Sequence, residues 1–117
     1  MAQFQFQSGV KTLDVKDSNG EVVKSYSIDV GQKEKTKKWI KEINELQKVG
    51  DKFSEDENAI DELEVMERKV VNAILGETAF DELFTISGSN VFSMLSFVKY
   101  LSSFLNDAMQ AFYKDYV

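Results

Sequence analysis

The sequence of 117 residues contains no cysteine, no histidine and no proline. Without cysteine the chain forms no disulfide and offers no thiolate, a composition that fits a reducing compartment. Without histidine it lacks the usual general base at neutral pH and the commonest metal ligand. Without proline no helix carries a proline kink. These absences exclude a disulfide scaffold and leave few side chains suited to catalysis.

The sequence also lacks an excess of positive charge and a long apolar run. Its net charge is −6, and an acidic chain repels phosphate backbones, so we expect no nucleic-acid partner. The N-terminus lacks the basic start and continuous apolar run of a signal peptide. The best candidate for a membrane span, residues 91–105, is interrupted by serines and Lys99 and falls short of about 20 residues. We therefore expect no membrane partner.

The amino acids that are present fit one small domain of the α+β class. Hydrophobic residues make up 43% of the chain and aromatic residues 12%, enough for one modest core. We expect a single domain over residues 1–117. A β-hairpin region covers residues 1–32, and a region of about four helices covers residues 33–117, the last of them long and apolar.

Residues 10–30 have the pattern of a β-hairpin. Alternating residues 10–15 lead into Asn19-Gly20, a strong hairpin turn signal, and residues 21–30 return. A bulge at Gly20 would shift the register by one residue, so the pairing stays open. The expected buried face comprises Leu13, Val15, Tyr26, Ile28 and Val30. Phe4 and Phe6 alternate with glutamines, so they form either a third strand or a frayed end.

The first helix is expected over residues 34–49, with Gly50 as its C-terminal cap. Trp39, Ile43 and Leu46 recur at helical spacing and predict one apolar stripe. A tryptophan in phase with such a stripe is usually part of the core, and we assign Trp39 there.

The second helix is expected to begin at Ser54, which forms a capping box with Glu57, and to end at Gly76. Glu67 lies within its apolar stripe, and we expect this carboxylate to reach the rim or to pair with a lysine. The stripe comprises Ile60, Leu63, Val70, Val71 and Ile74.

Thr78 is expected to cap a short third helix and Asn90 a long last one, over residues 90–116. The apolar arc of this last helix spans roughly 220°, whereas an ordinary surface helix needs only about 100°. The rest of the chain can cover one face, and the other indicates a second subunit or a client. The candidate surface for self-association or partner binding comprises Phe97, Tyr100, Phe104, Ala108 and Ala111.

No motif in the sequence indicates catalysis, a metal or a cofactor. The acidic residues lack the spacing of a calcium-binding loop, and no phosphate-binding glycine loop is present. Ser87 and Ser89 have no histidine to activate them. We therefore expect a protein that is not an enzyme, with no catalytic, metal or cofactor-binding residues, and whose function is to bind other proteins.

One segment carries a resemblance to a known family. Residues 75–84 fit the pattern L-G-E-x-A-F-x-x-[LI]-[FY], followed by a Ser/Gly/Asn break at residues 87–90 and the long apolar helix. This arrangement resembles the tail assembly chaperones of long-tailed phages and prophages of Gram-positive bacteria. Size, acidity and the order of the expected elements also match that family over most of the chain.

The resemblance implies a role in phage tail morphogenesis. Its members bind the tape measure protein and tail tube subunits, associate with their own copies, act in the cytoplasm of the bacterial host and are not retained in the mature virion. Many also exist in a longer, frameshifted form. Two alternatives stay open: a small acidic secretion-type chaperone or adaptor, and a structural component of the tail.

Overall fold

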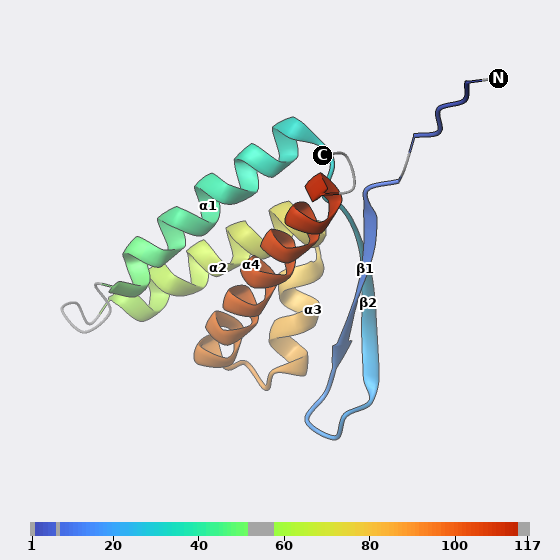
Figure 1. The fold of residues 1–117 in the computed structure, drawn as a ribbon. Coiled ribbons are helices and arrows are strands. Elements are labelled where there is room, and N and C mark those ends of the chain that lie inside the picture. Colours follow the sequence, from blue (N-terminus) through green and yellow to red (C-terminus); the bar gives the residue numbers. More distant parts are fainter. Residues whose placement is uncertain (1, 7, 52–57, 115–117) are drawn as a thin grey trace.

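The computed structural model of the chain describes residues 2–6, 8–51 and 58–114. An antiparallel hairpin of two strands precedes four helices, and the last helix is the longest of those described. This architecture confirms the α+β class and the predicted order of elements (Figure 1). The strands are β1 (Val10–Lys16) and β2 (Val22–Asp29), and the helices are α1 (Lys33–Asp51), α2 (Ala59–Leu75), α3 (Ala79–Ile86) and α4 (Val91–Lys114).

The hairpin turn is organised by Asp17, whose Oδ1 accepts hydrogen bonds from the backbone N–H groups of Asn19 (2.9 Å) and Glu21 (3.1 Å). Gly20 takes a φ of 82°, a value that other residues rarely adopt. Leu13 pairs with Tyr26, and the only register irregularity in the described sheet follows Val15, not Gly20. The predicted inner face is confirmed: Leu13, Tyr26, Ile28 and Val30 are buried and Val15 is half-buried.

The third strand considered for Phe4 and Phe6 is not formed: residues 2–6 lie outside the sheet. The last ladder pair joins Val10 to Asp29, and the N–H of Val30 then donates to the Gly9 carbonyl (3.0 Å). Beyond that point β2 has ended, so residues 2–6 have no strand opposite them. They leave the body as an N-terminal arm, the name used below for residues 2–6 (Figure 1).

The predicted C-terminal end of the first helix differs from the structure. Helix α1 continues to Asp51, so Gly50 lies inside it and does not cap it; no left-handed backbone is found at Gly50. Gly76, by contrast, has a φ of 122° and ends α2 as predicted. The capping box of Ser54 and Glu57 falls outside the described residues, and α2 as described begins at Ala59.

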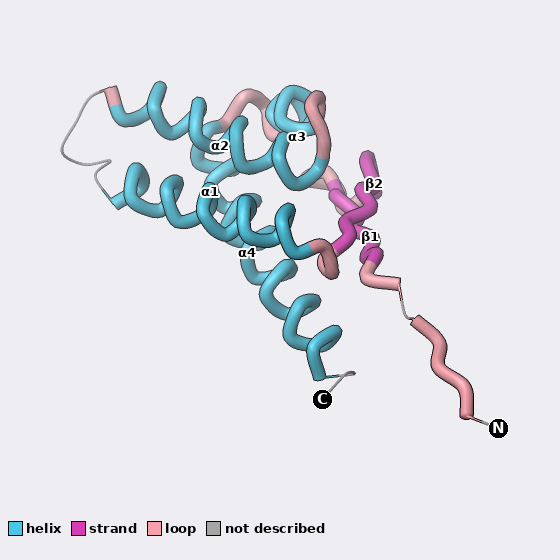
Figure 2. Tube along the Cα trace, turned by 90° about the horizontal axis from the view of Figure 1, so that it is seen from above, coloured by secondary structure: helices cyan, strands magenta, loops and turns pink. Residues whose placement is uncertain are grey.

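Helix α2 is the centre of the fold, since it contacts α1, α3, α4 and strand β2 (Figure 2). Trp39 is 4% exposed, which confirms its place in the core, and its indole Nε1 donates to the Ala73 carbonyl at 3.0 Å. Ile60 was predicted to be buried but is 44% exposed, because it lies in the first turn of α2, at the outer end of the bundle. None of the described helices has the length and apolarity needed to cross a membrane.

Candidate interaction surface

Helix α4 carries the candidate surface and begins as predicted. The Asn90 side chain accepts hydrogen bonds from the N–H groups of Phe92 and Ser93, both at 3.0 Å, which satisfies two donors of the first turn. Its inward stripe packs into the core through buried residues at helical spacing. These are Met94, Val98, Leu101, Leu105 and Ala108.

The five residues predicted to face a partner are not equally exposed. Tyr100 is 57% exposed and Ala111 is also exposed. Phe97 and Phe104 are half-buried against the core, and Ala108 is buried at 9% exposure. The chain therefore covers more of this face than the helical arc alone suggests, and the role of the five residues in self-association stays a prediction.

A shallow hollow brings four of these five residues together. Tyr100, Phe104, Ala108 and Ala111 line it, and its volume is about 390 Å³. Lys11 of β1 and the polar Ser103 and Asp107 of α4 complete the lining. Phe97 belongs to a different hollow beside the hairpin turn. The Tyr100 hollow, as we call the first of these, is thus an apolar surface with one lysine and one aspartate on its lining.

A second apolar feature on α4 was missed by the sequence reasoning. Helices α1 and α4 both pack on α2, and between them runs the α1–α4 groove. Its larger section, of about 300 Å³, is lined from α1 by Thr36, Trp39, Ile40, Ile43, Asn44 and Gln47, and from α4 by Ser102, Leu105, Asn106 and Met109. A smaller section of about 170 Å³ continues it and shares Ile43, Gln47 and Ser102 with the first.

The groove could not be found from periodicity alone. Ile43 was assigned to the same apolar stripe as the core residue Trp39. The distance between α1 and α4 on α2 decides whether the apolar residues of the two helices pack against one another or leave a groove between them. The one local signal was Ile40, which adjoins the Trp39 stripe and is 48% exposed on the groove wall.

Glu67 contradicts the sequence expectation most clearly. Its side chain does not reach the rim or pair with a lysine; it is 0% exposed. Within the part of the chain that the structure describes, neither Oε1 nor Oε2 has a hydrogen-bond partner. Burial, reinforced by the negative charge of Glu64, raises the pKa of Glu67 to about 8. The carboxyl is therefore mostly protonated at neutral pH.

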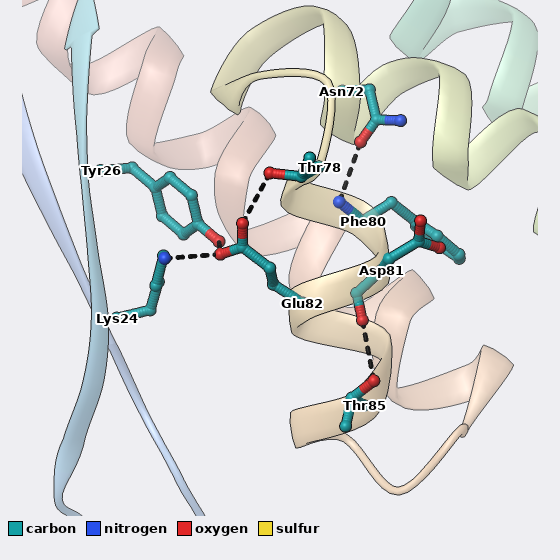
Figure 3. A network of polar contacts seen from close by, with 8 residues as sticks. All are labelled: Lys24, Tyr26, Asn72, Thr78, Phe80, Asp81, Glu82 and Thr85. Atoms are coloured by element: carbon teal, nitrogen blue, oxygen red, sulfur yellow. Dashed lines mark hydrogen bonds and ion pairs between the residues drawn. The ribbon is translucent and has the colours of Figure 1, made fainter.

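The hairpin is held against α3 by a polar cluster centred on Glu82 (Figure 3). Glu82 Oε2 receives the Lys24 ammonium at 2.7 Å and the Tyr26 hydroxyl at 3.3 Å, while Oε1 accepts from the Thr78 hydroxyl at 2.6 Å. The hydrogen bond from Lys24 and then that from Thr78 lower the pKa of Glu82. Burial, and next the nearby Glu82 charge, raise the pKa of Tyr26 to about 12. The cluster joins side chains of β2 to α3.

The cap of α3 also differs from the prediction. Thr78 occupies the N-cap position but makes no capping hydrogen bond, because its hydroxyl donates to Glu82. Asn72 of α2 takes over part of that role: its Oδ1 accepts from the N–H of Phe80 at 2.8 Å (Figure 3). A residue eight positions before Phe80, on another helix, thus satisfies a donor in the first turn of α3, which sequence rules for local caps do not consider.

Replacing Asn72 with Ala should lower the free energy of unfolding by about 1–2 kcal/mol, the usual cost of losing a helix cap. Thr78→Ala removes only an exposed side-chain hydrogen bond and should cost clearly less. Asn72→Asp keeps the acceptor and is the matched control. Urea unfolding followed by circular dichroism measures all three; an equal or larger loss for Thr78→Ala would contradict this assignment of the cap.

Among residues 2–6, 8–51 and 58–114, no group of three or more acidic side chains is arranged to hold a metal ion. Comparisons with protein-family models, with curated proteins and with solved structures gave no match. Functional inference therefore depends on this chain's own residues. Two of the apolar depressions that α4 helps to line, the Tyr100 hollow and the α1–α4 groove, are the candidate binding surfaces.

Proposed function

We propose that this protein is a tail assembly chaperone of a long-tailed phage or prophage. In this role it binds the tape measure protein and tail tube subunits in the cytoplasm of the bacterial host and is not retained in the mature virion. The proposal combines the resemblance of residues 75–84 to that family with the apolar surface on α4. It requires only binding, and no chemical step by this chain.

The residues of the family-like segment have a structural explanation here. Gly76 ends α2 with a left-handed backbone, and Ala79, Phe80 and Leu83 are buried where α3 packs on α2. The stacked rings of Phe80 and Phe84, 5.2 Å apart, extend this contact. The pattern therefore describes the corner between α2 and α3. It supports a shared fold and does not itself identify a binding surface.

The observation that carries the proposal is the Tyr100 hollow. It lies on a helix surface, exposes the Tyr100 ring and the small Ala111 side chain, and has only Lys11 and Asp107 as charged lining residues. A long, apolar, aggregation-prone helix is a partner that such a surface can cover. Several hundred Å² buried at about 25 cal/mol per Å² gives on the order of 10 kcal/mol before the costs of association, which consume much of it. Because little net binding free energy remains for one contact, we expect each contact to be weak and several copies to bind along one client.

Co-expression with the tape measure protein, which the proposed role places in a neighbouring gene, tests the proposal. We expect the partner to remain soluble with the wild-type chain and to precipitate with Tyr100→Glu, which places a charge in the hollow. Val65→Glu is the matched control, because Val65 is a 64% exposed apolar residue of α2 outside both depressions. Equal solubility of the partner with both variants would show that the Tyr100 hollow does not bind it. Recovery of the chain from purified particles would instead indicate a structural tail component.

A further inference from the structure

The N-terminal arm is the most exposed aromatic segment among the described residues. Phe4 is 71% exposed and Phe6 is 85% exposed. Their rings meet edge to face with centroids 4.8 Å apart, so they form one apolar cluster on the arm. Figures 1 and 2 both show the arm pointing away from the helices of its own chain. Two clustered phenylalanine rings exposed to water in this way form an apolar contact surface that the helices of the same chain do not cover.

The α1–α4 groove matches this arm in chemistry. Charged residues make up 29% of the chain, yet none lines the larger section of the groove. The arm, too, contains no ionisable side chain: Ala2, Gln3, Phe4, Gln5 and Phe6 are all neutral. Asp51 and Lys99 line only the smaller section. Pairing the arm with the larger section therefore avoids the desolvation of a charge that most other pairings on this protein would require.

The polar groups of the two surfaces also match. Asn44, Gln47 and Asn106 place amide groups on the groove lining, beside the apolar Ile40, Ile43 and Met109. Amides offer both donors and acceptors, and so do Gln3, Gln5 and the arm backbone. The phenylalanines can enter the apolar part of the groove while the glutamines pair with its amides. A charged or purely aliphatic segment would leave one of these sets without partners.

We propose that the N-terminal arm of one copy of this chain occupies the α1–α4 groove of a second copy, and that the exchange is reciprocal. Each phenylalanine buries about 150–250 Å², so one arm removes about 300–500 Å² from water. An equal area on the groove and a second, symmetry-related arm bring the total to about 1,200–2,000 Å². That total lies in the range of specific protein–protein interfaces, and reciprocal exchange gives the closed two-fold symmetry most common among homodimers.

Light scattering from micromolar to millimolar concentration tests the exchange. We expect the wild-type chain to form dimers, and Phe4→Ser/Phe6→Ser to weaken dimerisation on the order of tenfold or more. Ile40→Glu, on the exposed wall of the groove, should do the same. If Ile40→Glu does not fold, Asn106→Glu on the opposite wall replaces it. A wild-type chain that stays monomeric at millimolar concentration overturns the proposal.

Mixing the two variants distinguishes arm exchange from other dimers. The Phe4→Ser/Phe6→Ser chain keeps an intact groove, and the Ile40→Glu chain keeps an intact arm, so the mixture should form heterodimers through one arm–groove contact. Failure of the mixture to associate overturns the proposal. So does a dimer that survives Phe4→Ser/Phe6→Ser but not Ile40→Glu, since it would show the groove occupied by something other than the arm.

This inference is separable from the proposed chaperone function. Tyr100→Glu should leave the dimer unchanged, because the Tyr100 hollow and the groove share no lining residue. Loss of the dimer in Tyr100→Glu would assign self-association to the hollow and contradict the arm exchange. Conversely, the Phe4→Ser/Phe6→Ser variant can lose dimerisation and still keep a co-expressed client soluble. Client solubility therefore tests the hollow independently of the dimer.

Discussion

A Glu67→Met variant should lose most of the pH dependence of stability that the wild-type chain shows between pH 5 and 8. Below pH 4.5 the carboxyl is protonated in both folded and unfolded states. As the pH rises towards 8, the unfolded state releases this proton while the folded state, with its pKa raised to about 8, retains it. The wild-type chain should therefore become less stable by about 3–4 kcal/mol between pH 5 and 8, at about 1.4 kcal/mol per pKa unit.

The effect is large because the whole stability of a small domain is about 5–15 kcal/mol. Groups with lowered pKa values, such as Glu82 and Asp29, act in the opposite direction but below pH 4.5, so they do not mask it. Glu67→Gln is the control: it also removes the ionisation but keeps a buried polar group without a partner. Glu67→Met should thus be the more stable of the two by about 1–3 kcal/mol.

Urea unfolding of the wild type and both variants at several pH values measures this prediction. The wild-type and Glu67→Met stabilities should be closest at pH 5 and diverge steadily up to pH 8. Parallel curves would show that Glu67 titrates normally in the folded protein and so is not enclosed as the structure has it.

Trp39→Ala should lower the free energy of unfolding by about 3–5 kcal/mol, the range for deleting a large buried aromatic side chain. Trp39 is 4% exposed and lies at the contact of α1 with α2, where its indole also donates to the Ala73 carbonyl. Trp39→Phe keeps a ring in the same space but leaves that carbonyl without its donor, so it should cost less, about 1–3 kcal/mol.

Urea unfolding is monitored by circular dichroism, because Trp39 is the single tryptophan and its replacement removes the tryptophan fluorescence. A loss below about 1 kcal/mol for Trp39→Ala would place the indole on the surface. A loss for Trp39→Phe as large as that for Trp39→Ala would assign the whole effect to the hydrogen bond and none to packing.

The elements of this fold were predictable because their signals are local. Asp17 and Gly20 define the turn, Gly76 ends α2, and Asn90 caps α4, each acting within four residues along the chain. Trp39 could be assigned to the core because its helical phase with Ile43 and Leu46 suffices to predict burial. In these cases one physical effect dominates and its residues are close in sequence.

The mismatches come from contacts between distant segments. Thr78 has the right position for a cap, but Glu82 competes for its hydroxyl and Asn72 supplies the acceptor from another helix. Glu67 is enclosed by helix packing that no local pattern describes. The α1–α4 groove depends on the spacing of α1 and α4, which their packing on α2 fixes. The apolar pattern of each helix alone therefore gave no sign that some of its residues line an opening.

The candidate surface was partly predictable for the same reason. Helical periodicity placed Tyr100, Phe104, Ala108 and Ala111 on one side of α4, and the structure brings those four together in one hollow. Periodicity could not tell how far the hairpin and the other helices cover that side, and so it overstated the exposure of Ala108. Tyr100 is consequently the residue that best reports on the surface.

Site-specific photo-crosslinking tests the central claim, that this chain holds a client on the Tyr100 hollow. The chain has no cysteine, so Tyr100→Cys and Val65→Cys each provide one attachment site for a photoreactive label. In a mixture with the tape measure protein that we propose as the client, we expect the label at position 100 to crosslink to that protein and the label at position 65 to give little product. Equal crosslinking at both positions, or product at position 65 alone, would contradict the account.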